Sequence, residues 1–385
     1  MKLKKTAVVL LLVLIVMGLI LPIPAGFLKK DIKNQFKRNG YILENIDVSI
    51  KLPGKIILKN IKMKNHNCDI LTAKKVTLEG SLLKMRGFKK RVSEIKLSKE
   101  NFSKEISKPI KKVLIKDASL QSFSSFFGFT NVNGTFKFSS KKISGDLTLE
   151  AAVYDVYKLG KQNVKLKFTQ NDLSINLSKG EFANGKIEGE GVLNFVDTTV
   201  SNIKFKGKNL SLSDIANSDK ISGNVTLNFE GEKFIINEVK LFGEGKVLVK
   251  EFKEDGYRDL KAAKRSFKLM GINSINFDKI TFPFVSSGDS LITELVVAKR
   301  DDVEVSGSGY TRIKDSYFNF KINGELDGSL EKEVSPVIWD ALLPLENGGK
   351  SFNGKVRGVP SNYTVSVDKK LMKRSINSFF NKMFN

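Results

Sequence analysis

The amino-acid sequence predicts a mainly β protein whose strands form one long, curled antiparallel meander, either an open groove or a flattened barrel or sandwich. Three observations predict this fold class. Apolar residues recur at every second position over most of the chain after residue 130, which is the spacing of half-buried strands. Short polar turns separate the alternating stretches. Only a few short stretches have helical spacing, so helices are too few to cover such a sheet.

The clearest alternation lies between residues 290 and 326. In the first strand of this stretch, one side of the chain is expected to carry Leu291, Thr293, Leu295 and Val297. Turns are expected at residues 300–302 and 314–316, because short polar residues favour turns. The apolar side of the two following strands is then expected to hold Val303, Val305, Gly307, Gly309, Thr311, Ile313, Phe318, Phe320, Ile322, Gly324 and Leu326.

Other segments follow the same pattern. Strands are expected at residues 46–50 and 56–63, joined by a turn at Pro53-Gly54. The last two strands are expected at residues 352–360 and 363–367. Residues 259–269 and 330–345 look helical, and the second of these carries the only tryptophan, Trp339. Between these segments, alternating apolar residues include Phe136, Phe138, Leu147, Leu149, Ala151, Val153, Val164, Leu166, Phe168, Leu173, Ile175, Leu177, Ile187, Ile203, Phe205, Ile221, Val239 and Leu241.

The N-terminus has the composition of a membrane anchor. Three lysines in the first five residues precede an uncharged run from Thr6 to Leu28, and these 23 residues can span a bilayer. A cleaved signal peptide is the alternative, because Pro22-Ile23-Pro24-Ala25 follows the apolar run. We therefore expect residues 1–28 to form a single transmembrane helix in a bacterial inner membrane, with the bulk of the chain in the periplasm.

Residues 29–130 form a basic region, which we expect to be α+β, with short helices near residues 28–39 and 100–112. The whole chain has a formal charge of +24, and residues 1–130 hold 27 Lys and Arg against 9 Asp and Glu. Such an excess favours an anionic partner. Nucleic acid is disfavoured, because arginine is scarce and the phenylalanines fall mostly on the apolar side of the strands. A phospholipid bilayer fits better.

Residues 131–368 are expected to form the repetitive β-groove. If the groove holds lipid, its apolar side should contact the acyl chains. The lining residues that we expect are Leu193, Phe195, Val225, Leu227, Phe229, Val247, Val249, Val303, Val305, Phe318 and Phe320.

Residues 369–385 are expected to form a basic amphipathic helix. Its apolar stripe consists of Met372, Ile376, Phe379, Phe380 and Met383, with lysines and an arginine around it. This composition fits a helix that lies on an anionic membrane. The alternative is a helix that caps the open end of the sheet and buries the same stripe.

No motif in the sequence indicates catalysis, a metal site or a cofactor. The segments Gly189-Glu190-Gly191, Gly243-Glu244-Gly245 and Gly307-Ser308-Gly309 lack the following helix that a phosphate loop needs. His66 stands alone in an expected turn, and Cys68 lacks the spacing of a metal or redox motif. We therefore predict a protein that is not an enzyme and that needs no cofactor.

Several short motifs lie near the two ends of the chain. Near the N-terminus these are the helix end Phe36-Lys37-Arg38-Asn39-Gly40, the turn Leu52-Pro53-Gly54 and the strand Leu58-Lys59-Asn60-Ile61-Lys62-Met63. At the C-terminus, Gly358-Val359-Pro360 precedes a last strand. Together these motifs resemble those of the AsmA-like envelope proteins. Within that superfamily, the segment ending in Leu342-Leu343-Pro344-Leu345 is similar to the type II secretion system protein N family.

The resemblance implies a membrane-anchored periplasmic groove that takes part in lipid traffic and envelope biogenesis. Two functions of different classes follow. The first is a lipid-handling protein whose groove binds or conveys phospholipid acyl chains. The second is a structural accessory component of a type II secretion system, with a packed interior, no lipid cargo and secretion or envelope-assembly proteins as partners.

Overall fold

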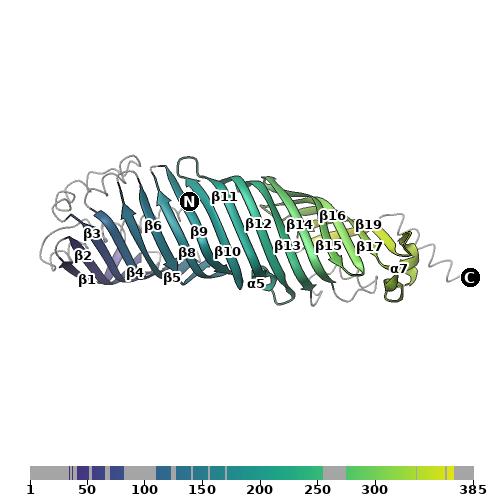
Figure 1. Cartoon of the computed structure of the whole chain (residues 1–385), viewed down its shortest axis with the longest axis horizontal. Coiled ribbons are helices and arrows are strands. Elements are labelled where there is room, and N and C mark those ends of the chain that lie inside the picture. Colours follow the sequence, from purple (N-terminus) through teal and green to yellow (C-terminus); the bar gives the residue numbers. More distant parts are fainter. Residues whose placement is uncertain are drawn as a thin grey trace, which may run out of the picture. The chain divides into compact units, whose positions relative to one another are not determined.

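The computed structural model describes twenty strands that form one large antiparallel sheet (Figure 1). The mainly β prediction is therefore confirmed. By its internal contacts the chain divides into two compact units, and β10 and its flanking turns lie at the division. The described residues are 34, 37, 41–51, 54–65, 70–81, 110–122, 127–139, 142–154, 157–169, 171–254, 275–334, 336–359 and 362–367.

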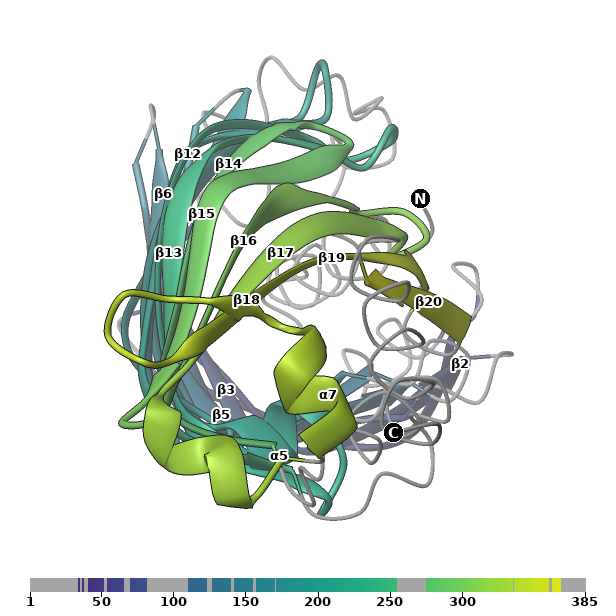
Figure 2. The ribbon, with the colours of Figure 1, turned by 90° about the vertical axis from the view of Figure 1, so that its right-hand side faces the viewer.

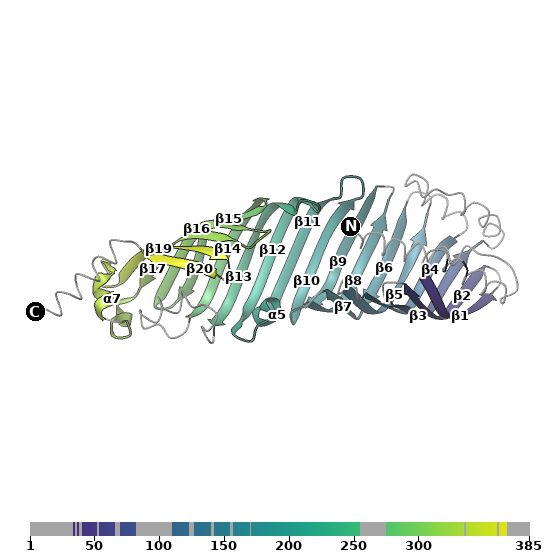
Figure 3. The same cartoon turned by 180° about the vertical axis from the view of Figure 1, so that it is seen from behind.

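The first unit is a meander in which each strand pairs with the next. Between β5 and β8, two short strands take the place of one: β6 and β7 each pair with β5 on one side and with β8 on the other (Figure 3). The strands are β1 (Tyr41–Lys51), β2 (Lys55–Asn65), β3 (Ile70–Gly80), β4 (Ile110–Ser122), β5 (Phe127–Phe138), β6 (Ile143–Leu149), β7 (Ala151–Tyr154), β8 (Tyr157–Phe168), β9 (Asp172–Phe182) and β10 (Gly185–Asn194).

The core of the first unit forms on one face of this meander. Ile56, Leu58, Val76 and Leu78 are 0% exposed, because alternate residues of paired strands project to the same side and pack against one another. The predicted strands at residues 46–50 and 56–63 lie within β1 and β2 and contribute to this core. Ile110, where we had expected helix, instead begins β4 and is fully buried in the same core.

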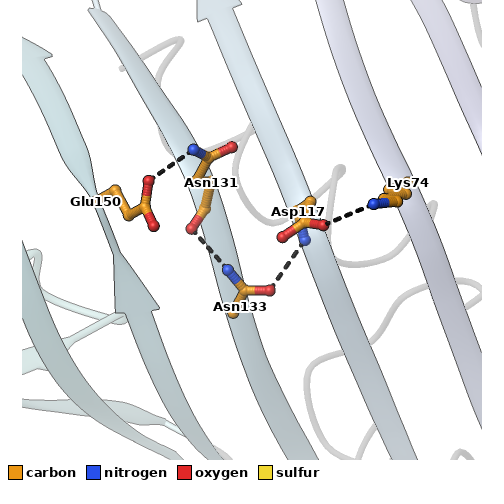
Figure 4. A network of polar contacts seen from close by, with 5 residues as sticks. All are labelled: Lys74, Asp117, Asn131, Asn133 and Glu150. Carbon is orange, nitrogen blue, oxygen red and sulfur yellow. Dashed lines mark hydrogen bonds and ion pairs between the residues drawn. The ribbon is translucent and has the colours of Figure 1, made fainter.

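Left-handed residues interrupt strands β2, β4 and β5 of the first unit. Asn60, Asp117 and Asn131 have φ values of 53°, 51° and 52°, and asparagine and aspartate tolerate this conformation best after glycine. Asp117 and Asn131 lie where the β4–β5 register shifts, so they mark β-bulges. A polar network on these strands is shown in Figure 4, in which Asn131 Nδ2 donates to Glu150 at 2.7 Å and the backbone N–H of Asp117 donates to Asn133 at 3.0 Å. The network satisfies polar groups that the bulges release from the ladder.

The second unit repeats the meander and adds short helices. Successive strands pair up to β17, which pairs with β19, and β19 also pairs with β18 and β20. The elements are β11 (Thr199–Ser211), α5 (Leu212–Ala216), β12 (Ile221–Ile235), β13 (Lys240–Glu254), β14 (Ile275–Gly288), β15 (Ser290–Arg300), β16 (Val303–Arg312), β17 (Phe318–Leu326), η2 (Gly328–Lys332), α7 (Pro336–Ala341), β18 (Leu343–Pro344), β19 (Lys350–Val359) and β20 (Asn362–Val367).

The alternation predicted for the residues of strand β15 is wrong in its second half. Thr293 pairs with Gly309 but Val296 pairs with Gly307, so the ladder shifts between them. Such a bulge moves every later side chain of the strand to the other face. Leu295, which we had predicted to share a face with Leu291, is consequently 53% exposed. Val297, predicted on the same side, pairs with Ser306 on the opposite face to that of Leu291.

Three further expectations need correction. Val239, predicted as the first apolar residue of a strand, occupies the turn before β13 with φ 55°. The predicted helix at residues 330–345 is divided into η2 and α7, because Pro336 can begin a helix but cannot continue one, and Leu343–Pro344 is strand β18. Helix α5 was not predicted. Ser211 caps it by accepting a hydrogen bond from the backbone N–H of Asp214.

Several predicted segments lie outside the described residues. They are the anchor at residues 1–28, the helix at 259–269, the turn residues His66 and Cys68, and the C-terminal helix at 369–385. Within the part of the chain that the structure describes, none of the helices combines the length and the apolar character that crossing a membrane requires.

Candidate apolar binding face

Three rows of apolar residues cross strands β12, β13 and β14 of the second unit on one face. Leu227 pairs with Val247, which pairs with Phe282. Because paired residues project to the same side of a sheet, each row is continuous. The other two rows are Val225, Val249 and Ile280, and Phe229, Gly245 and Phe284. Together with Val305, Phe318 and Phe320 on β16 and β17, these residues form what we call the apolar face.

Five phenylalanine rings form a continuous series on this face. Phe229 and Phe284 stack at a centroid distance of 6.1 Å and an interplanar angle of 9°. The series continues from Phe284 to Phe282 at 5.8 Å, from Phe282 to Phe320 at 6.4 Å and from Phe320 to Phe318 at 6.5 Å. These separations are typical of favourable aromatic pairs. We call this series the aromatic row.

The contact between Phe282 and Phe320 shows that the apolar face is concave. Phe282 lies on β14 and Phe320 on β17, so β15 and β16 separate them. Three strand spacings correspond to about 14 Å on a flat sheet, yet the ring centroids are 6.4 Å apart. Side chains converge in this way only on the inner side of a curved sheet. Figure 2 shows the curve of β12 to β19 seen end-on.

Helices cover one end of the apolar side of the sheet. Leu330 of η2 and Trp339 of α7 are 4% exposed, and both belong to a small core with Leu326 at the end of β17. Val303 and Phe352 on neighbouring strands pack against this core. The predicted lining residue Val303 is therefore partly buried against protein.

The remainder of the apolar face is covered less completely. Val225 and Phe229 are buried, at 6% and 8% exposure. All other members of the face are only half-buried, whereas core residues of the first unit such as Ile56, Leu58 and Val76 are 0% exposed. Asn228, directly after Leu227, is exposed and pairs with Lys246 on the opposite, polar face. The second unit thus has one exposed polar face and one apolar face that remains partly exposed to solvent.

One buried hydroxyl lies among these apolar side chains. Thr293 is 3% exposed and pairs with Gly309, so it shares the face of Phe320. Among the residues that the structure describes, its Oγ1 has no hydrogen-bond partner. An unsatisfied buried hydroxyl costs about 1–3 kcal/mol. A ligand oxygen at this point of the apolar face would offset that cost.

An open depression of about 620 Å³ lies at the bulge of β15, and Thr293 is among its lining residues. Ile292 and Tyr310 are cross-strand partners there, and Ile292 is 44% exposed. The complete lining is Ser290, Ile292, Thr293, Glu294, Ser308, Gly309 and Tyr310.

Two pairs of oppositely charged residues with a shifted pKa lie at turns of the second unit. In the hairpin between β15 and β16, the hydrogen bond to Asp302 raises the pKa of the Arg300 guanidinium. Before β13, the Lys240 ammonium lowers the pKa of the Glu238 carboxyl by a hydrogen bond at 2.7 Å. No group of three or more potential metal ligands occurs within the described ranges. The apolar face can therefore bind by burial of apolar surface, with the Thr293 hydroxyl as its polar contact.

The predicted lining residues are only partly brought together. Val225, Leu227, Phe229, Val247, Val249, Val305, Phe318 and Phe320 lie on the apolar face, as defined above. Leu193 and Phe195 are half-buried in the first unit. The predicted membrane contact at Met372, Ile376, Phe379, Phe380 and Met383 lies outside the described residues.

Sequence analysis missed Phe282 and Phe284, which join the two parts of the aromatic row. Their period-2 spacing was a signal, but Pro283 between them is unfavourable within a strand. The structure accommodates Pro283 where the ladder between β14 and β15 is interrupted, between Thr281 and Val285.

Comparisons with known proteins add no relative to these observations. No protein-family model, no curated protein and no solved structure matches the chain.

Proposed function

We propose that the chain is an envelope protein whose apolar face binds or conveys the acyl chains of phospholipids. The observation that carries this proposal is the aromatic row on a concave face whose aliphatic neighbours remain half-buried. Burial contributes about 25 cal/mol for each Å² of apolar surface. A long unbranched acyl chain supplies such surface with no need for a charged partner.

The proposed setting is the periplasm, with residues 1–28 anchoring the chain in the inner membrane. The basic n-region and the uncharged run of 23 residues support the anchor, and the motifs similar to AsmA-like proteins support the envelope setting. The polar face, with residues such as Asn228 and Lys246, suits an aqueous compartment.

Lipid analysis of the purified protein tests this function. The domain from residue 29 onward is purified without detergent, extracted with organic solvent and analysed by mass spectrometry. We expect phospholipid in stoichiometric amount. A well-folded sample without lipid contradicts the proposal and favours the alternative, an accessory scaffold of a secretion system with a packed interior.

Two adjacent substitutions serve as a matched pair in the same assay. Leu227→Glu places a carboxylate on the apolar face, where burial of an unpaired charge costs several kcal/mol, so bound phospholipid should be lost. Asn228→Glu places the same carboxylate on the exposed face opposite Lys246 and should retain it. Equal loss in both variants would argue against binding through the apolar face.

A further inference from the structure

A row of lysines crosses the first unit on the face opposite to its core. The pairing register places Lys55, Glu79, Lys112, Lys137, Ser144 and Lys167 side by side on six adjacent strands, β2, β3, β4, β5, β6 and β8. We call the four lysines of this series the lysine row. At about 4.8 Å for each strand, it extends over about 24 Å.

The lysine row follows one end of the strands. Lys55 is the first residue of β2, Lys137 is the second-last of β5, and Lys167 is the second-last of β8. The adjacent residues on the opposite face, among them Leu78, Val113 and Phe136, are buried in the core. The backbone beneath the lysines is therefore held rigidly, and the ammonium groups are presented along a line.

Some lysines of the protein face a carboxylate, as Lys62 and Lys64 face Glu44 at 2.9 and 2.7 Å. Others face a lysine: Lys59, Lys75 and Lys116 lie side by side on β2, β3 and β4, on the same face as the lysine row. In the row, Lys112 pairs directly with Lys137, and like charges in this position are destabilising.

Glu79 is the one acidic residue among the six, and it forms an ion pair with Lys55 at 3.0 Å. Lys112, Lys137 and Lys167 follow with Ser144 as the one interruption, and Lys137 and Lys167 are exposed. The row keeps like charges next to one another, although a single substitution would remove the repulsion between them. This arrangement indicates a surface that binds a negatively charged partner outside the chain.

We propose that the lysine row docks on the surface of a bilayer that contains anionic phospholipid. The ammonium group is a compact, flexible point charge that suits a fluid array of lipid phosphates. Single-stranded nucleic acid requires aromatic rings between the cations, and the row contains none. This docking does not depend on the proposed acyl cargo. It uses a charged face of the first unit, whereas the acyl chains are proposed to bind an apolar face of the second unit.

A fluorescent probe on the full chain in nanodiscs tests the docking. The probe is attached to Ser144→Cys, within the row, in a Cys68→Ser background, and the lipid headgroups carry a spin-label quencher. Quenching should be strong in discs with phosphatidylglycerol, weak in discs of phosphatidylcholine alone, and reduced by salt, because salt screens exposed charges. A probe at Lys158→Cys, near the other end of β8, should show little quenching in either disc.

Two triple variants provide the matched comparison. The row variant combines Lys112→Gln, Lys137→Gln and Lys167→Gln, and the control variant combines Lys74→Gln, Lys161→Gln and Lys179→Gln, which are exposed lysines farther along the strands. Each lysine near an anionic surface contributes a factor of about five, so the row variant should lower the ratio of docked to undocked protein about 100-fold. The control variant should retain docking.

The row variant should fold, because its substitutions relieve repulsion between Lys112 and Lys137, and circular dichroism checks this directly. Quenching at Ser144 that is equal in the two lipid mixtures, or that persists in the row variant, would overturn the proposal. Salt-sensitive binding to RNA in place of the anionic discs would overturn it as well.

Discussion

Glycines face phenylalanine rings across paired strands on the apolar sides of both units. Examples are Gly145 with Phe136 in the first unit and Gly309 with Phe320 in the second. A glycine leaves room for the neighbouring ring to lie over the backbone, and the ring in turn shields that backbone from water. These phenylalanine rings thus depend on glycines at the matching register positions.

Substitution of Gly145 should be costly for this reason. A Cβ at this position would lie 2.6 Å from Cε1 of Phe136, a ring that is 4% exposed. Overpacking of a core typically costs about 1–3 kcal/mol, and Gly145→Ala should lower stability by that amount in urea denaturation followed by circular dichroism.

The neighbouring residue is the control for this prediction. Ser144→Ala projects to the opposite face and should change the free energy of unfolding by less than about 0.5 kcal/mol. If the two variants were equally stable, the Phe136 ring would not occupy the space above Gly145.

At the scale of elements, turns and caps decide where the sheet is interrupted. Asp327 ends β17 and caps η2, because its Oδ1 accepts a hydrogen bond from the backbone N–H of Ser329 at 2.9 Å. This bond lowers the pKa of the Asp327 carboxyl below its usual 3.8. The cap positions Leu330, which belongs to the small core under the helices.

The contribution of this cap should depend on pH. Since the folded state lowers the pKa of Asp327, the carboxylate stabilises the fold above pH 3.8, and this stabilisation disappears as the pH falls through the lowered value. Asp327→Ala should therefore melt below the wild type at pH 7, and the difference in melting temperature should shrink below pH 3.8. Glu331→Ala, on the same short helix, should show no such convergence.

The sequence predicted the turns and most strands of the second unit but none of its bulges. The turns predicted at residues 300–302 and 314–316 are found at residues 301–302 and 313–315, because short polar residues favour such turns locally. The bulge in β15 depends on which residues of β14 and β16 lie opposite, so local alternation gave the wrong face for Leu295. Pro283 argued against a strand for a similar reason. A strand can accommodate this proline only because the ladder between β14 and β15 is interrupted there.

The candidate site was predictable only as a list of apolar positions. Alternation correctly placed residues such as Leu227 and Val247 together on one side. It could not show that Phe282 and Phe320 meet across two intervening strands, because curvature accumulates over many residues and has no local signature. Nor could it show that Val303 packs against the small core that includes Leu330 and Trp339.

At the scale of the whole molecule, the proposed topology makes a direct prediction. With Met1 to Lys5 in the cytoplasm and one membrane span, an alkaline phosphatase fused after Asn385 should be active, because this enzyme requires the periplasm. A cytoplasmic reporter at the same position should be inactive. A stable but inactive phosphatase fusion would exclude the periplasmic location. It would also contradict the proposed envelope function.

The contact between Phe282 and Phe320 has a mechanical consequence. The backbone ladders from β14 to β17 run between consecutive strands, so a change in curvature bends them without breaking a hydrogen bond. The two rings, by contrast, connect strands that are not neighbours, and they would separate as soon as the sheet flattened. The contact between Phe282 and Phe320 therefore favours the curved arrangement of β14 to β17 over a flatter one.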